Sequence, residues 1–197
     1  MINTETNTIT LAGKQLDIRT ERLSYEQYLE LADHIEKEEI DFDLSEVKIV
    51  VPSELENAGF DSTDCIELFE QLDGETDLDF TGPNVSGEWR IIKQDSIQLI
   101  AFEEIIEGDE YVLGCFASWF IANHFEMISI DVAEALQKAE AFSELGKLIQ
   151  RQSRDEQREF VEDYLSTDGE GHHFAHYDHN QYEFKFGGSD FIAFRTN

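Results

Sequence analysis

The sequence is poor in basic residues and cysteines, and it has no long hydrophobic run. Its 197 residues include only 14 Lys and Arg against 44 Asp and Glu, which gives a formal net charge of −30. A protein of this charge is repelled by nucleic-acid phosphates and by anionic lipid head groups. We therefore expect neither nucleic acid nor a membrane to be a direct partner.

Three further features of the sequence indicate where in the cell the protein is located. The most apolar run, residues 111–125, is shorter than the ~20 residues that span a bilayer. The initial "MINTETNTITL" has no basic segment followed by an apolar stretch, so we expect no signal peptide. The only cysteines, Cys65 and Cys115, lie in apolar helical patterns, which predicts two buried thiols in a reducing compartment. We expect a cytoplasmic protein.

Aromatic residues are plentiful, with 15 Phe, 6 Tyr and 2 Trp. Acidic disordered chains are poor in such residues, so the composition indicates a globular protein whose core offsets the self-repulsion of its charges. We predict a single domain over residues 1–197. The turn-rich "TGPNVSG" at residues 81–87 is a candidate internal boundary.

The hydrophobic patterns predict an α+β fold that is mostly helical. Small antiparallel sheets or hairpins are expected from the N- and C-terminal segments. The predicted strands are in residues 5–21, 47–51, 88–93 and 172–197. The predicted helices are residues 24–40 with Ser24 as N-cap, 61–73, 95–106, 111–125, 131–150 and 154–165. The last two segments are either separate helices or one helix bent around Gln152 and Ser153.

The stretch "DSTDCIELFEQLDGETDLDF", residues 61–80, holds eight acidic residues and no basic one. In its helical part, the spacing of Ile66, Phe69 and Leu72 predicts a buried face. The acidic series Asp64, Glu67 and Glu70 is expected to be exposed. After Gly74, acids at every second position would point the same way on an extended segment.

Basic residues are distributed unevenly. None lies between Lys48 and Arg90, and none lies between Lys93 and Lys138. By contrast, the three arginines of residues 151–158 alternate with acids, which is typical of a surface with many ion pairs. The surface without neutralising charges is therefore expected before residue 138.

The acidic residues are spaced like phosphates. Helix residues three or four apart have Cβ atoms ~5–6 Å apart, and alternate residues of a strand are ~6.6–7 Å apart. Both are close to the separation of phosphates along one DNA strand. The predicted partner-binding residues are Glu30, Asp33, Glu36, Asp61, Asp64, Glu67, Glu70, Asp73, Glu75, Asp77 and Asp79. The alternative is a solvated acidic face that keeps the protein soluble.

This small, acidic, aromatic-rich profile resembles the DNA-mimic antirestriction and anti-CRISPR inhibitors of phages and mobile elements, a resemblance of type without an aligned motif. It implies a non-catalytic inhibitor whose partner is a basic nucleic-acid-binding protein or complex of a host defence system. An immunity-type or regulatory module that masks a basic protein without mimicry is one alternative. A halophilic housekeeping protein is another, and a homodimer is compatible with all three.

Motifs for chemistry are few. The segment "HHFAHYDH", residues 172–179, would place His172, His176 and Asp178 on one face of a strand, where they could hold zinc or iron. Ligands from a single strand diverge, however, so we expect no metal site and no cofactor. Neither a phosphate-binding Gly-rich loop nor a nucleophile motif occurs, and we expect no enzyme.

Overall fold

The computed structural model describes residues 2–3, 8–11, 14–18, 20–40 and 42–197. It is α+β and mostly helical, as predicted. The chain forms two compact units, the first from residues up to Ile91 together with Tyr182–Asn197, and the second from Ile92–Gln181. The chain thus crosses between units at Ile92 rather than in the 81–87 turn cluster. The single-domain hypothesis stays a prediction.

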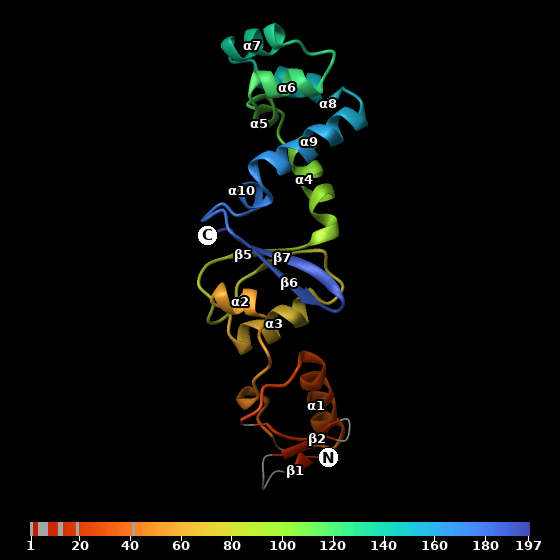
Figure 1. Cartoon of the computed structure of the whole chain (residues 1–197), viewed down its shortest axis with the longest axis vertical. Coiled ribbons are helices and arrows are strands. Elements are labelled where there is room, and N and C mark those ends of the chain that lie inside the picture. Colours follow the sequence, from red (N-terminus) through yellow and green to blue (C-terminus); the bar gives the residue numbers. More distant parts are fainter. Residues whose placement is uncertain (1, 4–7, 12–13, 19, 41) are drawn as a thin grey trace. The chain divides into compact units, whose positions relative to one another are not determined.

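The first unit contains two sheets (Figure 1). A three-stranded antiparallel sheet has the order β1-β2-β3, with Ile9 opposite Leu16. A four-stranded sheet has the order β4-β5-β7-β6, so β4 is an edge strand. The strands are β1 (Ile2–Asn3), β2 (Thr8–Leu11), β3 (Lys14–Asp17), β4 (Asp77–Phe80), β5 (Trp89–Lys93), β6 (Gln181–Phe186) and β7 (Ser189–Arg195).

The helices of the first unit follow local capping signals. These are α1 (Tyr25–Lys37), α2 (Ser53–Asn57), α3 (Ser62–Leu72) and the 3₁₀ helix η1 (Leu44–Glu46). Ser24 caps α1 as predicted and forms a capping box with Gln27. Leu31 and Tyr28 are buried on α1, whereas Leu29 is exposed.

Residues 47–51 do not form the predicted strand. They make only an isolated parallel bridge, between Leu23 and Ile49. Val47, Ile49 and Val51 are nevertheless buried in the core of the first unit. In the part of the chain that the structure describes, no further bridge extends this pairing, so residues 47–51 form a buried extended segment.

The core of the first unit is aromatic. Phe69 of α3 stacks on Phe186 of β6 with ring centroids 4.5 Å apart, and the Tyr25 ring contacts both of them. Phe60 packs against Phe80 and Trp89. Aromatic contacts of this kind supply large buried apolar areas. They offset the repulsion among the acidic side chains outside.

The second unit is built of short helices (Figure 1). They are α4 (Ile97–Ile106), α5 (Glu110–Gly114), α6 (Ser118–His124), α7 (Ile130–Lys138), α8 (Phe142–Gln150), α9 (Arg154–Asp168), α10 (Glu170–Phe174) and the 3₁₀ helix η2 (Gln94–Ser96). The single helix predicted for residues 131–150 is thus divided into α7 and α8. The strand structure predicted from His172 onward is wrong for residues 172–174, which belong to α10, whereas β6 and β7 confirm the later hairpin.

The predicted helix over residues 111–125 is also divided, into α5 and α6. A Cβ atom on Gly114 would clash with the backbone of Phe142, and one on Gly146 would clash with the backbone of Glu110. The two glycines therefore let α5 and α8 pack backbone to backbone. The Gln137 side-chain amide donates to the carbonyl oxygens of Gly114 and Phe116, at 3.0 and 2.8 Å, and so satisfies acceptors at the break.

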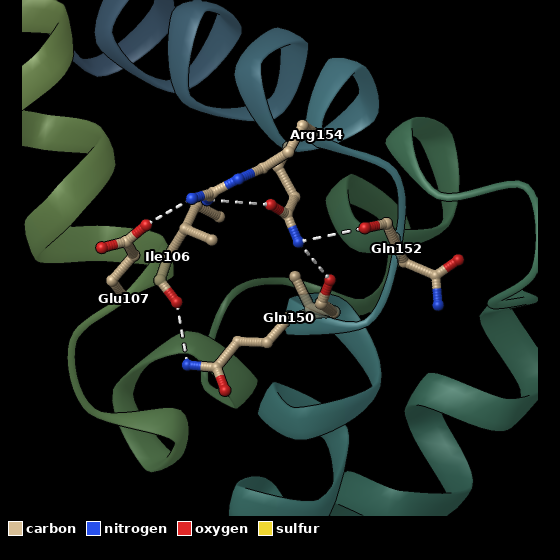
Figure 2. Close-up of polar contacts among 7 residues, drawn as sticks. Ile106, Glu107, Gln150, Gln152 and Arg154 are labelled. Atoms are coloured by element: carbon tan, nitrogen blue, oxygen red, sulfur yellow. Dashed lines mark hydrogen bonds and ion pairs between the residues drawn. The ribbon is translucent and has the colours of Figure 1, made fainter.

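Glutamine side chains connect the ends of α4, α8 and α9 (Figure 2). The Gln150 amide donates to the carbonyl of Ile106 at 2.8 Å. Buried Gln157 donates to the carbonyls of Ile149 and Gln152 at 3.0 and 3.3 Å. Helix C-termini leave carbonyl groups without intrahelical partners, and these side chains supply donors to them.

Candidate acidic partner-binding surface

The first unit holds 25 Asp and Glu against 8 Lys and Arg, a formal charge of −17. Two exposed acidic residues lie on α3, and two more lie between α3 and β4. Within the described part of the chain, none of them lies at ion-pair distance from a basic side chain. We call these four residues the acidic row: Glu67, Glu70, Asp73 and Glu75.

Asp64 is not part of the acidic row, and its predicted exposure is wrong. Its side chain is 0% exposed. One carboxylate oxygen accepts hydrogen bonds from the backbone N–H of Asn84 and Val85 at 2.8 and 3.1 Å, and the other accepts from the N–H of Asp61 at 3.0 Å. A step of three residues falls ~60° short of a helical turn, so Asp64 lies ~120° around the helix from Glu70.

Asp61 is exposed, but its carboxylate caps α3. It accepts from the backbone N–H of Thr63 and Asp64, and from the side-chain amide of Asn84 at 3.0 Å. Burial opposes its ionisation, yet these hydrogen bonds outweigh burial and lower the pKa of Asp61. Both Asp61 and Asp64 thus fasten α3 to the 81–87 turn. The predicted buried face of α3 is confirmed for Phe69 and Leu72, whereas Ile66 is half-buried.

The two predicted acidic residues of β4 differ in burial and in ion pairing. Asp77 is half-buried and receives two hydrogen bonds from the Arg90 guanidinium, at 2.8 and 2.5 Å, so it is neutralised. Arg90 lies on β5, and only the pairing of these strands brings it to Asp77. Asp79 is exposed. With Glu88 it borders a cleft of about 570 Å³ that Asp77 and Arg90 also line.

The predicted residues of α1 are exposed. Glu30 and Glu36 face solvent, whereas Asp33 receives a hydrogen bond from the Lys37 ammonium at 2.7 Å. Exposed pairs of this kind contribute little to stability, because solvent screens the two charges. Of the predicted residues of α1, Glu30 and Glu36 are therefore the two without an ion pair to another described residue.

The start of α1 packs beside the acidic row. The rings of Tyr25 and Phe69 lie 5.2 Å apart in an edge-to-face contact. Burial and, after it, the nearby Glu70 carboxylate raise the pKa of Tyr25 to about 12. The same two causes raise the pKa of Tyr28. The start of α1 therefore lies close to the negative charge of the acidic row.

The raised pKa of Tyr25 predicts that the protein loses stability at alkaline pH. A phenol whose folded-state pKa is raised from 10.0 to about 12 stabilises the fold fully below pH 10 and loses that contribution as pH rises through 12. We expect Tyr25→Phe to lose less stability than the unaltered protein between pH 8 and pH 11, as measured by urea denaturation. The matched control is Tyr111→Phe, on an exposed side chain. Equal losses in both variants would contradict the assignment.

The tail histidines do not share a strand. His172 and His173 lie on α10, where His173 pairs with Glu104 of α4 at 3.0 Å. His172 stacks on His179 with ring centroids 5.0 Å apart. Among the described residues, no group of three His, Cys, Asp or Glu side chains has metal-binding geometry.

We expect chelation to leave stability unchanged. A structural metal would stabilise the fold by many kcal/mol, so its removal would be visible in thermal unfolding. The measurement is the melting temperature of the purified protein with and without EDTA, together with its metal content. A drop of several degrees with chelator, reversed by added zinc, would contradict the expectation.

The two cysteines differ in exposure. Cys65 is buried, and burial followed by the Asp64 charge raises the pKa of its thiol to about 12. Cys115 is exposed, so its predicted burial is wrong. Across the described residues, no helix has both the length and the apolar character needed to cross a membrane.

The fold and the surface define an acidic α+β protein. Comparisons with protein-family models, with curated proteins and with solved structures found no match.

Proposed function

We propose that this protein is a non-catalytic, cytoplasmic inhibitor whose acidic surface imitates a nucleic-acid backbone. Its partner would be a basic nucleic-acid-binding protein or complex, of the restriction or CRISPR type. The observation that carries the proposal is the acidic row, which is exposed and has no ion pair among the described residues. Solubility alone does not require an unpaired row of this density, since a net charge of magnitude ~2–8 suffices for a small domain.

The spacing of the charges supports the proposal. Glu67 and Glu70 are three residues apart on α3, which puts their Cβ atoms ~5–6 Å apart. Asp73 follows at the helix C-cap, Glu75 lies between the helix and β4, and Asp79 lies on β4. A protein groove that accepts successive phosphates would meet a carboxylate at a similar interval.

The test is displacement of DNA. Restriction and CRISPR complexes are bound to fluorescent duplex DNA, the acidic protein is added, and release of DNA is followed by anisotropy. We expect competitive release that weakens steeply as salt rises from 50 to 200 mM, because the screening length falls toward ~8 Å. A matched control is DNA bound by an intercalating dye alone, from which no release is expected.

Two outcomes would contradict the proposal. A partner that holds DNA and this protein at the same time would instead support masking of a basic partner without mimicry. Inhibition that persists unchanged at high salt would show that contacts other than the carboxylates dominate binding.

A further inference from the structure

Helix α4 in the second unit is apolar on more than one face. Ile97, Ala101 and Ile105 are buried on one side. On the other side, the Leu99 side chain is 62% exposed and Phe102 is half-buried. Leu99 and Phe102 thus form an apolar patch on the side of α4 away from the core, beside the exposed polar residues Gln98 and Glu103. Exposed apolar patches with a polar rim are typical of contact surfaces.

This outer face opens onto a groove. Leu99 and Phe102 of α4 and Val161 of α9 contribute apolar side chains to a cleft of about 510 Å³ between the two helices. Both helices belong to the same compact unit. The volume lies within the range of concave sites that accept side chains or small molecules, ~300–1,000 Å³.

The rim of the groove is acidic, because its two arginines are already paired with carboxylates. Arg154 contacts Glu107 and lies 4.6 Å over the Phe102 ring, so its charge is engaged. Arg158 lies 3.7 Å from Asp155. Glu103 and Glu162 also line the cleft, and within the described ranges neither has an ion-pair partner.

We propose that the α4–α9 groove binds a basic amphipathic helix of a partner protein. An apolar side chain of that helix packs against Leu99 and Phe102, while flanking Lys or Arg side chains meet Glu103 and Glu162. A second copy of this chain is a poor occupant, because its charge of −30 would be repelled. The inference is independent of phosphate mimicry, since a nucleic-acid backbone offers no apolar side chain to this groove.

The experiment uses the full chain and a synthetic peptide. The probe is a fluorescent helical peptide of about 18 residues, with Leu at helical spacing and Lys elsewhere. Its control has the same composition with the Leu residues spread around the helix. We expect the amphipathic peptide to bind more tightly, and to bind equally well when the acidic row is replaced by amides. The second result separates this site from the proposed phosphate mimic.

Variants locate the binding. Leu99→Gln is expected to weaken binding about tenfold, because an apolar contact of order 1.4 kcal/mol is lost. The matched control is Val112→Gln on α5, a side chain that is 60% exposed and should change nothing. The double variant Glu103→Gln, Glu162→Gln should reduce the salt dependence, whereas Glu159→Gln should not.

Three results would overturn the inference. One is equal affinity of the two peptides, and another is an equal effect of Leu99→Gln and Val112→Gln. The third is a concentration-dependent dimer, seen by sedimentation, that Leu99→Gln dissociates, because a second copy would then occupy the groove.

Discussion

Replacing Glu67, Glu70, Asp73 and Glu75 together by Gln or Asn is expected to reduce inhibition of the partner by several orders of magnitude. Each carboxylate that meets a basic group at a desolvated interface contributes about 1–3 kcal/mol. Folding should be unaffected or slightly improved, because the four side chains are exposed and their removal relieves repulsion. The measurement is DNA displacement, with urea denaturation to check stability.

The matched control replaces four exposed acidic residues of the second unit by Gln or Asn in the same way. They are Asp131, Glu140, Glu144 and Glu159. Both variants change the formal charge from −30 to −26, so a general effect of net charge would appear in both. We expect near-normal inhibition from the control. Equal inhibition by the two quadruple variants would contradict phosphate mimicry by the acidic row.

Asp64→Ala is expected to be the most destabilising change to an acidic residue of α3. It leaves the backbone N–H groups of Asp61, Asn84 and Val85 without their acceptor. An unsatisfied buried donor costs ~1–3 kcal/mol, so the loss should be about 3–5 kcal/mol after partial relaxation. Urea denaturation measures it, and Asp64→Asn should lose less because one amide oxygen can still accept.

Glu67→Ala is the control for Asp64. It removes a carboxylate from the same helix, three residues away, where the side chain is exposed. Surface substitutions of this kind usually change stability by less than ~0.5 kcal/mol. If Asp64→Ala and Glu67→Ala cost the same, the turn at residues 82–85 does not depend on the Asp64 carboxylate.

Much of the candidate site was predictable from local sequence. Helix α3 begins and ends within one residue of its predicted bounds, because the capping residue Asp61 and the stop at Gly74 act on their immediate neighbours. The division of residues 111–125 was not predictable. The break depends on α8, where Gly146 and the Phe142 backbone approach α5 from far along the chain.

The sequence also did not reveal which individual acidic side chains are neutralised. Asp77 and Arg90 are 13 residues apart in sequence, and they meet because β4 and β5 are neighbours in one sheet. Asp64 shares the spacing of Glu67 and Glu70 but reaches the 81–87 turn. A periodic acidic pattern indicates where charge lies along a helix, but it does not reveal which neighbour covers each face.

The sequence by itself determined the large negative charge, the absence of basic residues between Lys48 and Arg90, and the predominance of helix. These follow from composition and from periodicities of two to four residues, which need no knowledge of distant contacts. Only the tertiary structure decided that Asp64 is buried, that Asp77 is paired, and that Leu99 borders a groove. Burial and ion pairing depend on which elements pack together, and that is a property of the folded chain.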